Sequence, residues 1–79
     1  MKAKIYVRLK EGILDPEGVT VGKALKALGF AGVGDVHVGK YIELTLKETD
    51  PERARESVDE MCRRLLTNPV IERYYCEVF

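Results

Sequence analysis

One stretch, residues 33–47, constrains the fold more than any other, because apolar and polar residues alternate along most of its length. Val36 and Val38 alternate with polar neighbours before Gly39, and the alternation resumes after Lys40. A period of two places apolar side chains on one face of a β-sheet and polar side chains on the other. The pattern predicts two strands that fold back as a hairpin about Gly39-Lys40. A single continuous strand with a bulge at Gly39 competes with the hairpin, since Gly-Lys is a weaker turn signal than Asn-Gly.

The same stretch contains a near match to a phosphate-binding loop. Residues 34–41 fit the pattern G-x-x-x-x-G-K but carry Tyr41 where a Ser or Thr would bind Mg²⁺. In a phosphate-binding loop the Lys opens a helix whose N-terminal amides face the anion. Here a strand pattern follows the Lys, so we interpret the segment as a turn between strands and not as a nucleotide site.

The length and composition of the chain predict one small domain, residues 1–79. At this size folding buries only about 60% of the surface of the chain, so we expect self-association to add stability. Basic and acidic residues balance at 13 each, which argues against nucleic acid or an anionic membrane as a partner. No apolar run reaches membrane length and no signal-peptide pattern is present, so we expect a cytoplasmic protein. Cys62 and Cys76 fall at apolar positions, which predicts core thiols and neither a disulfide nor a metal site.

Two segments carry the signals of a helix start. Asp15 and Asp50 each precede a proline, so each can cap a helix whose first residue needs no amide donor. The first predicted helix ends before Gly29 and has an apolar stripe at helical spacing, formed by Val21, Ala24, Leu25 and Leu28. The second is predicted over residues 50–67, with a stripe formed by Ala54, Val58, Met61, Cys62 and Leu65.

Two further strands complete the prediction. Residues 2–10 alternate like a strand with one buried face, whereas residues 70–78 are apolar on both faces, as in a strand covered on both sides. The order β-α-β-β-α-β is that of the ferredoxin-like α+β fold, with a four-stranded antiparallel sheet and both helices on one face. We expect Gly18 and Gly22 to let the first helix pack closely on that sheet.

The sequence shows no catalytic constellation. His37 is the only histidine and lies in a predicted strand, and Ser57, the only serine, lies in the middle of a predicted helix. Tyr6 and Tyr41 could stack on nucleic-acid bases, but the neutral charge balance and the intervening Glu43 argue against an RNA-binding role. A regulatory module that binds a small ligand at a subunit interface remains open, because fold alone does not decide function.

Three segments together resemble the PurS family, the small subunit of phosphoribosylformylglycinamidine (FGAM) synthase. They are LKEGILDPEG at residues 9–18, VGKYIEL at residues 38–44 and MCRRLLTNPVIE at residues 61–72. The resemblance covers the chain from end to end in the right order. It implies a ferredoxin-like fold and a homodimer or tetramer.

The resemblance also implies a place in a complex with a synthetase, PurL, and a glutaminase, PurQ. That complex converts formylglycinamide ribonucleotide (FGAR), with glutamine and ATP, to FGAM in purine biosynthesis. ATP and Mg²⁺ are expected in the large subunit. The small subunit is expected to bind no cofactor or metal, to supply no catalytic residue, and to help ammonia pass between the two larger subunits. The alternative is a stand-alone ligand-binding module acting at its dimer interface.

Positions in these segments that a free fold does not obviously need are the predicted contacts with the larger subunits: Lys10, Glu11, Asp15, Gly39, Lys40, Asn68, Pro69 and Glu72. Local roles compete for some of them, because Asp15 can cap a helix, Gly39 can turn a strand and Pro69 can end a helix. Exposed aromatic side chains on a small domain predict a self-association surface, here formed by Tyr6, Tyr41, Tyr75 and Phe79.

Overall fold

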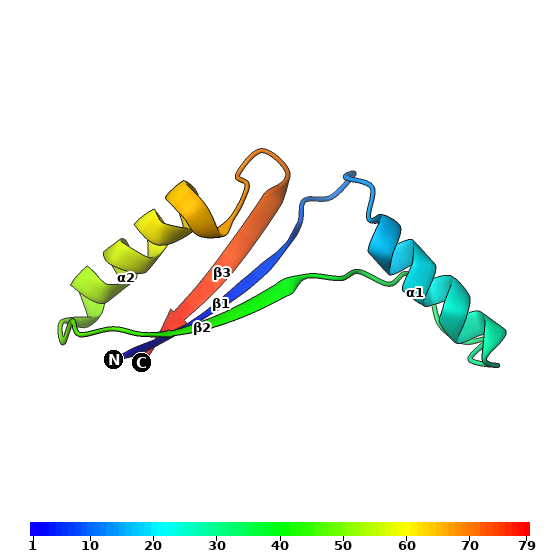
Figure 1. Cartoon of the computed structure of the whole chain (residues 1–79), viewed down its shortest axis with the longest axis horizontal. Helices are drawn as coiled ribbons and strands as arrows, with labels where there is room; N and C mark the ends of the chain where they lie inside the picture. The colour runs from blue at the N-terminus through cyan, green and yellow to red at the C-terminus, as the bar shows by residue number, and fades with distance from the viewer.

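Three antiparallel strands form one sheet. The computed structural model describes all 79 residues. Its elements, in chain order, are β1 (Lys2–Leu9), α1 (Pro16–Ala27), β2 (Lys40–Thr45), α2 (Pro51–Met61), the single-turn π-helix η1 (Cys62–Leu66) and β3 (Glu72–Val78). The strand order is β2-β1-β3, so the first strand of the chain is the central one (Figure 1). The fold is α+β as predicted, but the sheet has three strands and not four.

The predicted hairpin about Gly39 is wrong. Residues 33–39 do not turn back beside β2; they lead straight into it, as the green ribbon of Figure 1 shows. Gly12 and Gly29 are the only residues with positive φ, so Gly39 has no left-handed turn conformation. Its lack of a side chain serves another purpose, because a Cβ there would collide with the carbonyl oxygen of Val7 on β1. The competing interpretation, a single strand with a bulge at Gly39, is right that the chain does not reverse there, but the strand begins only at Lys40.

One face of the sheet carries the core. Ile5 on β1, Val58 on α2 and Cys62 at the start of η1 are completely buried, and Ala3 and Val7 complete the cluster. Half-buried apolar side chains surround it: Ile42, Leu44, Leu46, Leu66, Tyr74, Cys76 and Val78. Burial raises the pKa of the Cys62 thiol to about 11, so this thiol is protonated at neutral pH. The prediction of core thiols is confirmed for Cys62, while Cys76 is half-buried.

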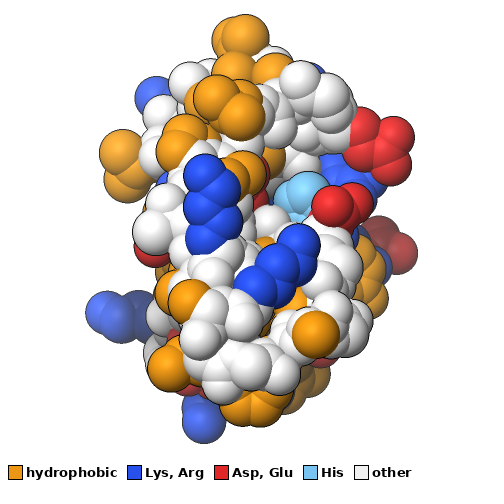
Figure 2. Space-filling model, turned by 90° about the vertical axis from the view of Figure 1, so that its right-hand side faces the viewer, with side chains coloured by type: hydrophobic (Ala, Val, Ile, Leu, Met, Phe, Trp, Pro, Cys, Tyr) orange, Lys and Arg blue, Asp and Glu red, His pale blue; other side chains and the backbone are white.

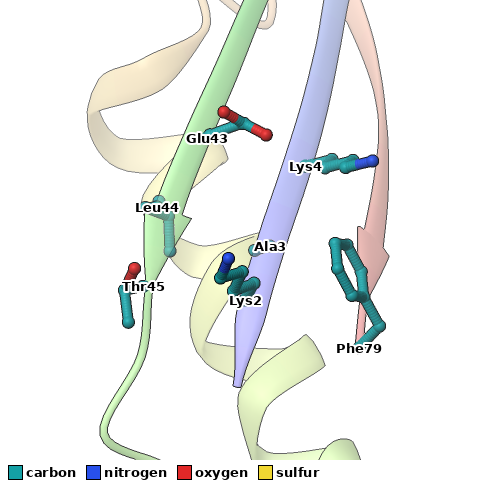
Figure 3. A pocket seen from close by; sticks show the side chains of 7 residues that line it. All are labelled: Lys2, Ala3, Lys4, Glu43, Leu44, Thr45 and Phe79. Carbon is teal, nitrogen blue, oxygen red and sulfur yellow. The ribbon is translucent and has the colours of Figure 1, made fainter.

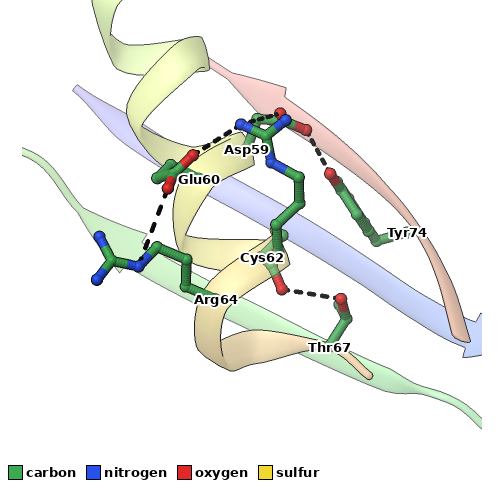
Figure 4. A network of polar contacts seen from close by, with 7 residues as sticks. Asp59, Glu60, Cys62, Arg64, Thr67 and Tyr74 are labelled. Atoms are coloured by element: carbon green, nitrogen blue, oxygen red, sulfur yellow. Dashed lines mark hydrogen bonds and ion pairs between the residues drawn. The ribbon is translucent and has the colours of Figure 1, made fainter. Parts of the chain in front are cut away.

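Polar contacts fasten the end of the α2 helix to the sheet (Figure 4). The Tyr74 hydroxyl on β3 donates to the Asp59 carboxylate, which also lies 3.2 Å from the Arg63 guanidinium. The hydrogen bond to Asp59, together with burial, raises the pKa of Tyr74 to about 12. The Thr67 hydroxyl donates to the Cys62 carbonyl at 2.8 Å and closes the last turn. The helix therefore ends next to residue 67, as the sequence predicts.

The first helix does not cover the sheet. In Figure 1, α1 and the segment that returns from it project away from the three strands; we call residues 15–39 the arm. The only buried residues of α1 are Gly18 and Gly22, which face Val36 of the returning segment. The glycines do permit close packing, but against the returning chain and not against the sheet. The predicted apolar stripe is left without cover, and Leu28 is 75% exposed.

The arm makes the molecule long and thin. Its dimensions are 48 × 24 × 14 Å and its radius of gyration is 16.0 Å. A compact domain of this length has a radius of gyration of about 12 Å. No helix is both long enough and apolar enough to cross a membrane.

The two glycines of α1 offer a matched test of the arm. A Cβ at Gly18 would collide with the backbone carbonyl oxygen of Val36, whereas a Cβ at Gly22 would meet only the Val36 side chain, at 3.4 Å. We expect Gly18→Ala to lower the melting temperature measured by circular dichroism. Gly22→Ala should be neutral or stabilising, because Ala is favoured over Gly inside a helix by about 1 kcal/mol. Equal stability of the two variants would contradict this packing of the arm.

Candidate partner-docking surfaces

A row of three tyrosines crosses the open face of the sheet. Strand register places Tyr6 on the central strand directly opposite both Tyr41 on β2 and Tyr75 on β3. The ring centroids of Tyr6 and Tyr41 lie 5.1 Å apart, and those of Tyr6 and Tyr75 lie 6.1 Å apart. All three rings are exposed, Tyr75 by 62%. The structure confirms that these tyrosines are exposed and brings them together; self-association through them stays a prediction.

Charged groups of both signs border the tyrosine row. Arg8 and Arg73 lie opposite each other on β1 and β3 and, with Tyr6 and Tyr75 of the row, line a hollow of about 360 Å³. The pairing of the two arginines was not anticipated from the sequence. The polar positions of residues 2–10 could have pointed to Arg8, but its partner depends on strand register. Such a mixture of aromatic rings and guanidinium groups is typical of protein interfaces.

The other end of the open face holds a smaller hollow of about 220 Å³ (Figure 3). There the Lys4 ammonium lies 5.1 Å from the ring centre of Phe79, a cation–π contact. Glu43 on β2 accepts a hydrogen bond from the Tyr41 hydroxyl at 3.0 Å. Desolvation and this hydrogen bond raise the pKa of Tyr41 to about 12, so the phenol is a hydrogen-bond donor at neutral pH.

Five of the eight predicted partner contacts meet at one end of the sheet, where the loop after η1 approaches the start of β2. The Lys10 ammonium donates to the Pro69 carbonyl at 2.7 Å. The Lys40 ammonium donates to the Leu66 carbonyl at 3.2 Å and lies 3.8 Å from the Glu72 carboxylate. Two lysines from elsewhere in the chain therefore hold the loop between η1 and β3. We call residues 66–72 the tethered loop.

The tethered loop is also ordered from within. The backbone N–H of Asn68 donates to the Glu72 carboxylate at 2.7 Å, and the Asn68 side-chain oxygen accepts from the N–H of Val70 at 3.1 Å. Val70 itself is exposed. Of the other predicted contacts, Gly39 lines the same hollow as Lys40 and Glu72, at the base of the arm, whereas Glu11 is exposed on the preceding loop.

Asp15 is the remaining predicted contact, and it joins the two halves of the arm. One carboxylate oxygen accepts the N–H of Gly18 at 2.8 Å, which caps α1; the other accepts the N–H of Val38 at 2.9 Å. His37 Nδ1 lies 3.7 Å from the same carboxylate. The two backbone hydrogen bonds, Gly18 first, lower the pKa of Asp15. The capping role expected from the sequence is confirmed, and the bond to residue 38 is additional.

This lowered pKa predicts a pH dependence. A carboxyl whose pKa is lower in the folded state stabilises that state at pH values above its unfolded pKa of about 3.9, and this contribution is lost as the pH falls through the folded value. We expect the urea midpoint of the wild type to fall more steeply below pH 4 than that of Asp15→Asn. The exposed Asp35 on the same segment is the control: Asp35→Asn should keep the wild-type profile. Parallel profiles for all three proteins would contradict a stabilising role for the hydrogen bonds from Gly18 and Val38 to the Asp15 carboxylate.

The tyrosine row, the tethered loop and the arm together are typical of one class of protein. Nowhere in the chain do three His, Cys, Asp or Glu side chains gather in a way that could hold a metal ion. What the chain presents is an aromatic sheet face, a loop tethered by two lysines and a projecting arm. These are features of a small α+β subunit that acts by binding other proteins.

Comparison with known proteins narrows this class to one family. The model of the family described as "PurS: Phosphoribosylformylglycinamidine (FGAM) synthase" matches residues 2–79. The phosphoribosylformylglycinamidine synthase subunit PurS of Synechocystis is 48% identical over 95% of this chain and 75% of the relative. The chain belongs to the PurS family.

Solved structures agree with this assignment. The crystal structure of Methanocaldococcus jannaschii PurS superposes with a TM-score of 0.87 at 43% identity, over 96% of this chain and 92% of that one. Bacillus subtilis PurS superposes with a TM-score of 0.86 at 47% identity, over 96% and 94% of the two chains. The M. jannaschii protein is described as a subunit of formylglycinamide ribonucleotide amidotransferase in the purine biosynthetic pathway.

Proposed function

We propose that this chain is the small, non-catalytic subunit of FGAM synthase, and that it bridges a PurL-type synthetase and a PurQ-type glutaminase. The observation that carries the proposal is the family match over residues 2–79. The docking surfaces support it, since they offer binding area without reactive groups. The enzyme to which the subunit contributes is a ligase of de novo purine biosynthesis, and we place it in the cytoplasm.

The reaction explains why a bridging subunit is useful. The glutaminase hydrolyses glutamine to glutamate and ammonia, and the synthetase uses ATP to activate the amide oxygen of FGAR. Ammonia then replaces that oxygen, which yields FGAM, ADP and phosphate. The ammonia must travel between two active sites without loss to the solvent. A subunit that holds the two larger proteins in register serves this transfer, while ATP and Mg²⁺ stay in the large subunit.

The tethered loop is the part of the chain best prepared to contact a larger subunit. The bonds from Lys10 and Lys40 hold its backbone before any partner arrives. A loop that is already ordered loses little conformational entropy on binding. Val70 on this loop is 78% exposed, which leaves an apolar side chain at its tip for a partner to cover.

Reconstitution tests the proposal directly. FGAM formation by matched PurL and PurQ proteins would be measured with glutamine and ATP, with and without this chain, and complexes would be sized by chromatography with light scattering. We expect glutamine-dependent activity and a three-protein complex only when the chain is present. Ammonium chloride in place of glutamine is the control, because it bypasses the glutaminase and should remove the requirement. Equal glutamine-dependent activity without the chain would overturn the proposal and favour a stand-alone ligand-binding module.

A second prediction concerns the tyrosine row. Tyr75 contacts Tyr6 on the open face and buries little within the chain. We expect Tyr75→Ser to weaken the self-association of the chain at least about tenfold, which corresponds to about 1.4 kcal/mol. The unfolding midpoint should change little. Sedimentation or light scattering over a dilution series would measure the association. Glu77→Gln, two residues along the same face of β3, is the matched control. Equal association of both variants would show that the row is not an interface.

A further inference from the structure

Two arginines lie side by side at one end of the open sheet face. Lys2 and Phe79 exchange both backbone hydrogen bonds, so the alternation along β1 and β3 makes Arg8 and Arg73 a hydrogen-bonded pair of the same kind. Residues in such a pair have Cα atoms about 5.5 Å apart and side chains on the same face of the sheet. Both guanidinium groups can therefore reach one ion above the sheet.

Neither arginine has an acidic partner within the chain. None of the ion pairs involves Arg8 or Arg73, and both side chains are exposed. On the side of β2, Arg8 lies beside Gly39, which has no side chain to offer; a Cβ there would lie 3.6 Å from the Arg8 Cα. Like charges opposite each other destabilise a sheet, and a guanidinium group stays charged at physiological pH. The free chain thus carries an uncompensated double positive charge at this place.

Charges of both signs are mixed on other parts of the surface. Beyond the tyrosine row, Lys4 on β1 lies between Glu43 on β2 and Glu77 on β3. Figure 2 looks onto the arm end of the molecule, where basic, acidic and hydrophobic side chains lie among one another. On the open face, an anion is therefore attracted to the end that carries the two arginines and repelled by the two glutamates on the far side of the tyrosine row.

A phosphate ester fits this pair of arginines better than a carboxylate. A guanidinium group donates two parallel N–H bonds to an oxyanion, so one arginine already satisfies the two oxygens and the single charge of a carboxylate. A phosphate monoester has three terminal oxygens and a charge of about −1.5 to −2 at neutral pH. It can accept hydrogen bonds from both guanidinium groups and balance both charges.

The tyrosine rings beside the arginines can bind a planar group. Tyr6 and Tyr75 lie two residues along the same face from Arg8 and Arg73, a step of about 6.8 Å. These four residues line the hollow of about 360 Å³, a volume within the range of about 300–1,000 Å³ for small-molecule sites. Bases stack on exposed aromatic rings. An RNA strand would need an extended basic surface, which the balanced charge of the chain does not offer, whereas a single nucleotide needs only this local charge.

We propose that this hollow binds a mononucleotide, a phosphate ester joined through a sugar to a planar base. The phosphate lies between the guanidinium groups of Arg8 and Arg73, and the base stacks on the rings of Tyr6 and Tyr75. The glutamates beyond the tyrosine row oppose the reverse orientation. The site binds its ligand without reacting with it, and it is separate from the ATP site expected in the large subunit. It gives the small subunit a ligand of its own, in addition to its bridging role.

Four small probes test the two halves of the site. The isolated chain, labelled with ¹⁵N, would be titrated at physiological ionic strength with AMP, ribose 5-phosphate, adenosine and inorganic phosphate, and binding would be followed by NMR. We expect AMP to bind with a Kd below about 1 mM. The other three probes lack the base, the phosphate or the whole nucleoside, and each should bind at least about tenfold more weakly. Failure of AMP to bind would overturn the proposal, and so would equal binding of AMP and either phosphate probe, which would mark a simple anion site.

Two variants with the same change of charge on the same face test the residues. We expect Arg73→Gln to weaken AMP binding at least about tenfold and the control Lys4→Gln to change it less than about twofold. Arg73 is exposed, and its replacement removes the repulsion from Arg8, so the urea midpoint of Arg73→Gln should be unchanged or higher. Equal AMP affinity of the two variants would overturn the site.

Light scattering at each point of the titration separates nucleotide binding from self-association, because the site shares Tyr75 with the tyrosine row. The probe series on the wild-type chain decides the matter even if a variant fails to fold. Every measurement uses the chain alone, so its failure is distinct from failure to bridge PurL and PurQ.

Discussion

The packing of the α2 helix against β1 is the constraint on which the rest of the molecule depends, because it is where the chain closes a core on itself. Ile5, Val58 and Cys62 are completely buried there, and the contact between Tyr74 and Asp59 holds the end of the helix to β3. One helix can cover only part of a three-stranded sheet. The outer edge of β2 and most of α1 are therefore left without cover from the rest of the chain.

This unequal distribution of contacts suits a subunit of a larger enzyme. The arm and the edge of β2 are left uncovered within the chain, and the tyrosine row and the tethered loop lie on other parts of the surface. A chain with separate surfaces can bind more than one partner at the same time. The absence of catalytic groups from the sequence is then no deficit, since the chemistry of FGAM formation belongs to active sites elsewhere in the complex.

Much of the local structure could be predicted from the sequence because it depends on neighbours in the chain. Asp15 and Asp50 cap their helices through amides two or three residues ahead, and Gly29 adopts the positive φ of a helix stop. The alternation in residues 2–10 correctly assigns Ile5 to the core and Tyr6 to the open face. The exposure of the tyrosines was also predicted, whereas the tethers from Lys10 and Lys40 were not.

By itself, the sequence determined the two helices, their caps and the buried face of the central strand β1, because these follow from periodicity and from hydrogen bonds between near neighbours. Only the tertiary structure decided the direction of the chain at Gly39. The alternation on either side of that residue is the same for a hairpin and for a straight strand, so the pattern cannot distinguish them. The choice depends on packing between residues far apart in the chain: Gly39 lies against the Val7 carbonyl of β1, and the arm does not fold back onto the sheet.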